Sequence, residues 1–335
     1  MIVCGVLLVF LLGFPAWGQG VVVDQAGRQV ILPPRVERVV DLHGGATWVV
    51  YAMGGADLVV GAYFVGLPTD PLAQAALAQV DPRYEEKALS ILPGVETLLA
   101  LKPDVVFASS VVHGQGYADL LVELGIPTVL LYPETLELLV EAVELIGAVV
   151  GREGRAAALA GWIRGTVDLV AATAGRIEPR PTVYFSAFYP LNIYAGEVIQ
   201  NVITELAGGI PVGKELSPWR AGAFWYRANA EQVILWDPEV VIVPSYSRST
   251  LAEVAALDAF RGTRAVRTGR LYRFPSFFGP WDTPSPELAL GLLWLAEVLH
   301  PGATGVDVVA EAVQFYEEFF GCQVSPDDLG WRLGR

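Results

Sequence analysis

The sequence predicts an α/β protein built from two similar lobes, each with a parallel sheet. The first observation is a pattern that occurs twice, as ETLLALKPDVVF from Glu96 and as EQVILWDPEVVI from Glu231. In both copies a Glu opens a short apolar helix, a Pro without an N–H donor ends it, and an acidic residue precedes a Val-rich strand. The second observation is length, because 335 residues exceed one ordinary core and indicate two domains.

Hydrophobic alternation and Gly or Pro punctuation predict the elements of the first half. They are, in order, a β-hairpin over 21–38, a strand over 39–42, a helix over 47–53, a strand over 58–62, the helix and strand of the first repeat copy, and a further helix and strand ending near Tyr132.

Two helices are predicted around Gly151, over residues 135–150 and 153–175. The second would be about 35 Å long at about 1.5 Å per residue, long enough to brace two lobes as a spine. After it the αβ alternation resumes, with the strand TVYFSAF, the helix EVIQNVITELAGG, the second repeat copy, the strand GRLYRFP, the helix PSPELALGLLWLAEVLHP and an amphipathic tail. A weaker echo of the duplication relates TWVVYAMGG to VITELAGG.

Composition and the N-terminal segment restrict the function. A formal net charge of −14 argues against a nucleic-acid partner, which would need a basic face. Residues 1–18, MIVCGVLLVFLLGFPAWG, hold an apolar run followed by small residues, which predicts a cleaved secretory signal peptide. An uncleaved anchor is the alternative, because this segment has no Lys or Arg. The predicted organisation is therefore a signal over 1–18, an N-terminal lobe over 19–133, a helical spine over 134–178 and a C-terminal lobe over 179–335.

Several segments together resemble the periplasmic binding proteins of ABC importers for iron–siderophore complexes, haem and cobalamin. These segments are VVxLxxxxTxxxYAxGxxDxVVGx, ExLLALKPDVVxAS, LGIPTV, ELAGG, EQVxxWxPEVVIV and WDTPSPELALGLLWLAEVLHP. The WDTPSP segment and the FYEEFFG tail are most similar to iron-complex transporters, and one branch with similar features handles molybdate or tungstate.

The resemblance implies two Rossmann-like lobes with parallel sheets, joined by a single long rigid helix, with the ligand cleft between them. It implies a monomeric periplasmic substrate-binding protein that captures an iron complex and delivers it to the permease dimer of an ABC transporter. No intrinsic cofactor is expected; the transported ligand would be a metal complex or a metal oxyanion. The first alternative is a receptor for molybdate or tungstate. A chelatase-like enzyme is the alternative of another class, opposed by the secretory signal and by the lack of a His–Glu pair at helical spacing.

Candidate ligand contacts follow from the rule that open α/β sheets bind ligands outside the carboxyl ends of their strands. In the first lobe these candidates are His43, Thr47, Tyr63, Ser109 and His113. In the second lobe they are Tyr189, Trp219, Arg220, Trp225, Tyr226, Arg227, Tyr246, Trp281 and Asp282.

His43 is the leading candidate among them, and the candidate metal ligand. A neutral imidazole can ligate a metal, and a protonated one can donate to an oxyanion. Gly44 and Gly45 beside it would let a ligand approach closely. A structural role is the alternative for His43 and for His113.

The second lobe offers cationic and acidic candidates. Arg220 and Arg227 lie in an aromatic loop and can bind carboxylates, phosphates or oxyanions through a planar fork of N–H donors. For Asp282 the alternative is that it or Thr283 caps the helix that starts near Pro286.

Glu96 and Glu231 match the Glu of each lobe that, in the family resembled, docks onto Arg residues of the permease. The alternative is that each Glu only stabilises the start of its own helix, where the helix dipole favours a carboxylate.

Overall fold

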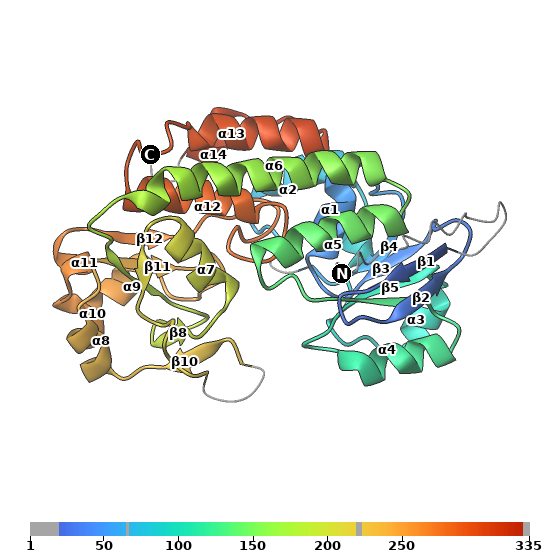
Figure 1. Ribbon diagram of the computed structural model, residues 1–335, viewed down its shortest axis with the longest axis horizontal. Helices are drawn as coiled ribbons and strands as arrows, with labels where there is room; N and C mark the ends of the chain where they lie inside the picture. Colours follow the sequence, from blue (N-terminus) through green and yellow to red (C-terminus); the bar gives the residue numbers. More distant parts are fainter. Residues whose placement is uncertain (1–19, 65–66, 219–222, 331–335) are drawn as a thin grey trace, which may run out of the picture.

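Two parallel four-stranded sheets form the framework of the computed structural model, which describes residues 20–64, 67–218 and 223–330 (Figure 1). The first sheet has the order β4-β3-β5-β6, and the second has the order β12-β11-β7-β9. Their strands are β3 (Val39–Asp41), β4 (Val59–Ala62), β5 (Val105–Ser109), β6 (Thr128–Leu131), β7 (Thr182–Phe185), β9 (Ile210–Pro211), β11 (Val240–Val243) and β12 (Leu271–Arg273). The predicted signal peptide lies outside the described residues, and the predicted domain boundaries stay a prediction.

Helices flank both sheets, and two antiparallel strand pairs complete the described fold (Figure 1). The pairs are β1 (Gly20–Val23) with β2 (Gln29–Leu32), and β8 (Asn192–Tyr194) with β10 (Trp225–Arg227). The α-helices of the first half are α1 (Ala46–Ala52), α2 (Pro71–Val80), α3 (Val95–Leu101), α4 (Gly114–Glu123), α5 (Leu136–Val149) and α6 (Glu153–Ala172). Those of the second half are α7 (Ile199–Leu206), α8 (Ala230–Trp236), α9 (Leu251–Ala256), α10 (Asp258–Arg261), α11 (Arg264–Arg267), α12 (Leu288–Leu299), α13 (Val308–Phe315) and α14 (Pro326–Gly330). Shorter helical turns are η1 (Tyr84–Lys87), η2 (Ala174–Arg176) and the π-helical η3 (Tyr316–Phe320).

The two lobes repeat one design, as the sequence pattern predicts. Helices α3 and α8 each have seven residues and end at a non-glycine residue in the left-handed region, Lys102 and Asp237. The acidic residues that follow, Asp104 and Glu239, accept hydrogen bonds from backbone N–H groups at the start of the neighbouring strand, at 2.9 and 3.0 Å. These matched bonds pin each repeat to its sheet. The predicted duplication is confirmed.

The weaker sequence echo is confirmed as well. Helices α1 and α7 are both followed by a Gly-Gly pair whose first member has a positive φ, 72° at Gly54 and 81° at Gly208. In each copy both glycine N–H groups donate back to carbonyls of the last helical turn. Glycine fits these positions because a Cβ would make the left-handed conformation costly.

Helix α6 spans 20 residues and ends three residues before the predicted limit, where η2 continues the chain. The C-terminal helices pack along it: α13 runs beside α6 in Figure 1, the rings of Trp162 and Phe315 lie 4.5 Å apart, and the Trp162 indole N–H donates to Glu311 at 2.8 Å. Arg155 donates to the carbonyls of Ala52 in α1 and Glu318 near the C-terminus, at 3.0 and 2.9 Å. The spine is therefore reinforced by the tail, which reaches the first lobe.

Candidate functional site

The loop between β3 and α1 is organised by the buried carboxylate of Asp41. Its Oδ1 accepts from the backbone N–H groups of His43 and Gly44 at 2.7 and 3.2 Å. Its Oδ2 accepts from the N–H and the hydroxyl of Thr47 at 2.7 and 2.8 Å. Burial nevertheless raises the pKa of Asp41 to about 6. The Thr47 hydroxyl is thus committed to Asp41, so the predicted contact at Thr47 supports the loop from within.

His43 projects from this loop with a defined tautomer. Its Nδ1 accepts a hydrogen bond from the N–H of Gly45 at 3.2 Å, so the proton of the neutral ring lies on Nε2. Burial, and then the charge of His113, lowers the pKa of His43 to about 4, which keeps the ring neutral at pH 7. In the described part of the structure Nε2 has no hydrogen-bond partner. His43 therefore presents one neutral N–H donor, which suits an oxygen acceptor; ligating a metal through Nε2 would require the other tautomer.

His113 and Ser109 brace a second loop of the same lobe. His113 Nδ1 accepts from the Ser109 N–H at 3.1 Å, its Nε2 donates to the Ile91 carbonyl at 2.8 Å, and the Ser109 hydroxyl accepts from the Val112 N–H at 3.2 Å. Tyr63, at the end of β4, is half-buried. Ligand contact by His113 would have to break a bond within its own lobe, whereas Tyr63 keeps an accessible side chain.

The WDTPSP segment forms the loop before α12 and is held by a buried carboxylate that the sequence did not reveal. Glu287 accepts from the N–H groups of Phe278 and Gly279 at 3.1 and 2.9 Å and from the hydroxyl of Tyr316. The indole N–H of Trp281 donates to Tyr316 at 3.1 Å, and Trp281 is only 1% exposed. Trp281 thus supports the loop from the core instead of facing a ligand.

The predicted cap at Asp282 or Thr283 is wrong. Helix α12 begins at Leu288, its N-cap is Glu287, and no side chain caps it. The Thr283 hydroxyl donates to the carbonyl of Pro280. Asp282 instead accepts from the hydroxyl of Tyr246 at 2.7 Å, and Tyr246 also bonds the hydroxyl of Tyr194 in β8.

The two lobes meet where the His43 loop approaches the WDTPSP segment. A Cβ added at Gly45 would lie 2.2 Å from the carbonyl oxygen of Pro284, so only glycine permits this contact. Nearby, the ring of Trp48 stacks on Phe278 at 6.1 Å. Burial first, then the charge of Asp282 and last that of Glu134, which follows β6, raise the pKa of Tyr194 in the second lobe. Asp282, which is linked through Tyr246 to Tyr194, is two residues from Pro284, so these three side chains and His43 belong to one boundary between the lobes.

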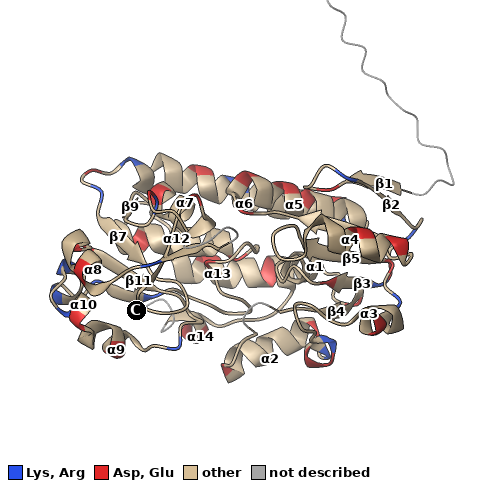
Figure 2. Cartoon of the chain, turned by 90° about the horizontal axis from the view of Figure 1, so that it is seen from below, with Lys and Arg blue, Asp and Glu red and all other residues tan. Residues whose placement is uncertain are grey.

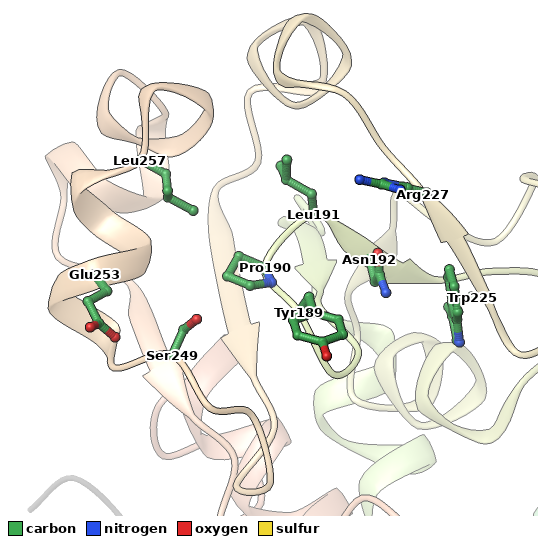
Figure 3. Close-up of a pocket in the computed structure, with 9 residues that line it drawn as sticks. All are labelled: Tyr189, Pro190, Leu191, Asn192, Trp225, Arg227, Ser249, Glu253 and Leu257. Atoms are coloured by element: carbon green, nitrogen blue, oxygen red, sulfur yellow. The ribbon is translucent and has the colours of Figure 1, made fainter.

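A pocket of about 590 Å³ gathers three of the predicted contacts, Tyr189, Trp225 and Arg227 (Figure 3). It lies between the β8–β10 pair and α9, which contributes Glu253. Strand alternation in β10 turns Tyr226 to the other face, where its hydroxyl accepts from Gln232 at 3.0 Å. Trp219 and Arg220 lie outside the described residues.

Glu96 and Glu231 occupy equivalent positions in the first turns of α3 and α8, and both are exposed. Neither caps its helix: α3 has no side-chain cap, and α8 is capped by the reciprocal bonds of Asn229 and Gln232. No ion pair to either carboxylate is found in the described ranges. Both carboxylates are free to meet a partner.

Two features are missing from the part of the chain that the structure describes. Its His, Cys, Asp and Glu side chains form no group of three or more that could hold a metal ion. Its helices include none that is both long and apolar enough to cross a membrane.

Acidic side chains are distributed over both lobes (Figure 2).

Two similar α/β lobes, with donor groups at the strand ends where they meet, define a two-lobed ligand-binding protein. The chain belongs to the periplasmic binding protein family, whose model matches residues 39–276. Members serve ABC importers and bind their solutes without transforming them, so the chain is not an enzyme and the chelatase alternative is excluded.

Individual relatives carry different solutes. The molybdate-binding protein MolA of Haemophilus influenzae is 23% identical, over 95% of this chain and 95% of its own. The vitamin B12-binding protein of Yersinia pestis is 25% identical, over 66% of this chain and 73% of its own.

Solved structures confirm the predicted fold class. MolA bound to molybdate superposes with a TM-score of 0.77 at 22% identity, covering 91% of this chain and 99% of that one. Helicobacter pylori CeuE with Ni(II) bound superposes with a TM-score of 0.76 at 18% identity, covering 92% and 98%. Iron-complex transport, the leading functional prediction, is not established by these relatives.

Proposed function

We propose that this protein is the periplasmic receptor of an ABC importer for a tetrahedral metal oxyanion, molybdate or tungstate. The observation that carries the proposal is the His43 loop. Asp41 folds the loop, and the Gly45 N–H fixes the His43 tautomer, so that a neutral Nε2–H donor remains free at the lobe boundary. A dianion is bound by hydrogen-bond donors and repelled by nearby carboxylates. In a protein with a net charge of −14, a neutral donor such as His43 Nε2–H suits such a ligand.

The ligand class is supported by the relative that matches 95% of the chain, which is named for molybdate binding. Molybdate and tungstate are acceptors on every oxygen and offer no donor. A site for them therefore requires N–H and O–H groups, and the second lobe offers the hydroxyl of Tyr194, which is hydrogen-bonded to that of Tyr246.

The test is a calorimetric titration of protein purified without denaturation, with molybdate, tungstate, a ferric siderophore and cobalamin as separate ligands. We expect saturable binding of both oxyanions and none of the two chelates. Elemental analysis of the same preparation should show molybdenum or tungsten. Tight binding of a chelate together with no response to either oxyanion would reject the proposal.

A second candidate, an organic metal chelate, is favoured by one observation, the pocket of Figure 3. Its volume of about 590 Å³ exceeds what a small oxyanion needs, and its aromatic walls and Arg227 suit an anionic chelate. Arg227→Ala would then weaken chelate binding at least tenfold. If the oxyanion is the ligand and meets His43, His43→Ala should weaken binding more than Arg227→Ala does.

Delivery to the permease would use Glu96 and Glu231. Both are exposed, unpaired in the described structure and equivalent by the internal repeat. Permease arginines are the partners that such carboxylates fit.

A further inference from the structure

Three side chains of the second lobe form a hydrogen-bonded chain at the lobe boundary. Asp282 Oδ2 accepts from the Tyr246 hydroxyl at 2.7 Å, and the Tyr246 and Tyr194 hydroxyls bond each other. They come from the WDTPSP segment, the loop after β11 and strand β8. These hydrogen bonds thus link the buried WDTPSP loop to the β8–β10 strand pair, which borders the pocket of Figure 3.

Asp282 is a buried carboxyl without a cation. Its exposed fraction is 0%, and Oδ1 has no hydrogen-bond partner in the described structure. The groups that face the chain are Gln200, which donates to the Asp282 backbone carbonyl at 2.8 Å, and Glu134, whose charge acts on Tyr194. Among the described side chains, no Lys, Arg or His forms an ion pair with Asp282. A carboxyl with one neutral donor and no cation favours its protonated form, and burial raises the pKa of Asp282 to about 7.

The protonation state of Asp282 decides which way the hydrogen bonds run. Each tyrosine hydroxyl has a single proton to donate. With Asp282 ionised, Tyr246 donates to it and Tyr194 donates to Tyr246, so Tyr194 offers other groups only lone pairs. With Asp282 protonated on Oδ2, the chain reverses, and the Tyr194 proton is free to point away from Tyr246.

Tyr194 is placed to use that proton on a ligand. It is the register partner of Trp225 in the β8–β10 pair, and it shares a strand face with Asn192, which lines the pocket. Burial first, and then the charges of Asp282 and of Glu134 in the first lobe, raise the pKa of Tyr194. Tyr194, only 6% exposed, therefore lies on the strand face that borders the pocket, beside the lining residues Asn192 and Trp225.

We propose that Asp282 is a positioning residue that couples oxyanion capture to the uptake of one proton. Protonated Asp282 turns Tyr194 into a hydrogen-bond donor for the bound anion, and ionised Asp282 turns it into an acceptor that repels the anion. The proton comes from solvent and stays on Asp282, and no bond of the ligand changes. This inference rests on the proposed function, and it adds that affinity depends on pH and on a residue that does not touch the ligand.

The experiment is a calorimetric titration with micromolar molybdate between about pH 6 and about pH 8.5, in two buffers of different ionisation enthalpy. Because binding takes up a proton, the affinity for molybdate must fall as pH rises above the pKa of Asp282 in the ligand-free protein. The fall is up to about tenfold per pH unit. Proton uptake should approach one per molybdate at the alkaline end, because free Asp282 is then ionised. A cationic ligand would show the opposite slope.

The Asp282→Asn variant tells whether Asp282 orients the tyrosine hydroxyls, contacts the ligand directly or only packs in the core. Asn can donate to Tyr246 at every pH, so this variant should keep binding molybdate with an affinity that no longer depends on pH and with no proton uptake. Tyr246→Phe cuts the chain and should also abolish proton uptake. Asp258→Asn is the matched control, since Asp258 is an exposed carboxylate of α10, and it should keep the wild-type slope.

The outcomes distinguish this inference from the proposed function. Molybdate binding with a flat pH profile, or with an unchanged slope in a folded Asp282→Asn variant, would overturn the proton coupling and leave the receptor function standing. No molybdate binding at any pH would overturn both. If the Asp282→Asn variant does not fold, the Tyr246→Phe variant provides the test. Proton uptake that is retained in Tyr246→Phe would refute the coupling.

Discussion

At the residue scale, one backbone hydrogen bond decides what His43 offers a ligand. The Gly45 N–H occupies Nδ1, so the neutral ring keeps a donor on Nε2. His43→Ala should weaken molybdate binding at least tenfold, about 1.4 kcal/mol, while leaving the thermal transition unchanged because the side chain is only half-buried. His43→Gln, which retains an N–H donor, should recover part of the loss. Calorimetry is the measurement, and unchanged affinity in a folded alanine variant would make His43 structural.

Buried carboxyls predict how stability depends on pH. Burial raises the pKa of Asp282 and of Glu287 to about 7 and that of Asp41 to about 6. The native state then binds more protons than the unfolded chain, whose carboxyls titrate near about pH 4. The free energy of unfolding should therefore fall as pH rises from about 4 to about 7, by about 1.4 kcal/mol for each unit of a group's shift. Urea unfolding at about pH 5 and about pH 8 checks this, and Asp282→Asn should flatten the fall; greater stability at pH 8 would contradict it.

The sequence predicts some of these residues and misses others for a physical reason. His43 stands out because a titratable ring precedes two glycines after a strand. Asp41 and Tyr194 do not, since each ends a strand of only three residues, which is too short to show a pattern. Trp225, Tyr226 and Arg227 were predicted together, and only the strand pairing of β10 shows that Tyr226 turns away from the other two.

At the element scale, helices α6 and α5 each contain a glycine, one at an exposed position and one at a tight helix–helix contact. Gly161 lies on the exposed face of α6 with nothing within 4 Å of an added Cβ, whereas a Cβ at Gly147 of α5 would lie 2.2 Å from that of Ala156. Gly161→Ala should raise the free energy of unfolding by about 0.5–1 kcal/mol through helix propensity. Gly147→Ala should lower it, because the two helices would have to separate. Chemical denaturation of both variants checks this, and stabilisation by Gly147→Ala would contradict the close packing.

Elements with a local signal were predictable, and those made by distant contacts were not. The repeat helices, the helices α5 and α6 and the Gly-Gly ends rest on neighbouring residues, so the predicted limits of these helices agree with the structure to within a few positions. The β8–β10 pair joins segments more than thirty residues apart, and the WDTPSP loop is held by Glu287 and Tyr316 from different elements. The hydrophobic periodicity of a single segment predicts neither strand pairing nor side-chain contacts between distant segments.

At the scale of the whole molecule, the tail and the WDTPSP loop tie the lobes together in addition to α6. Gln323, near the C-terminus, donates from its backbone to Gln79 of α2 at 3.1 Å, and Trp48 of the first lobe stacks on Phe278 of the second. Several links across one boundary restrict rotation about any single hinge. We therefore expect little closure, and we expect the permease to recognise fixed surface groups, one on each lobe.

We expect the two repeat carboxylates, Glu96 and Glu231, to supply such groups, and this gives the last prediction. If Glu96 and Glu231 each pair with a permease arginine, Glu96→Ala and Glu231→Ala should each reduce transport while affinity for the ligand stays constant, because both side chains lie outside the site. The double variant should transport less than either single one, since a receptor held at both lobes gains from simultaneous engagement. Arg at both positions should be worse still, through repulsion of like charges.

Uptake into vesicles that contain the permease, at low ionic strength, is the measurement. Glu153→Ala is the matched control: Glu153 is also an exposed Glu in the first turn of a helix, but α6 lies on the side of the molecule opposite α8 (Figure 1). That variant should transport normally. Because α8 is capped by Asn229 and Gln232, loss of Glu231 should also leave the thermal transition almost unchanged, so reduced uptake would not reflect unfolding. Undiminished uptake by the double Arg variant would mean that these carboxylates contribute only to their own helices.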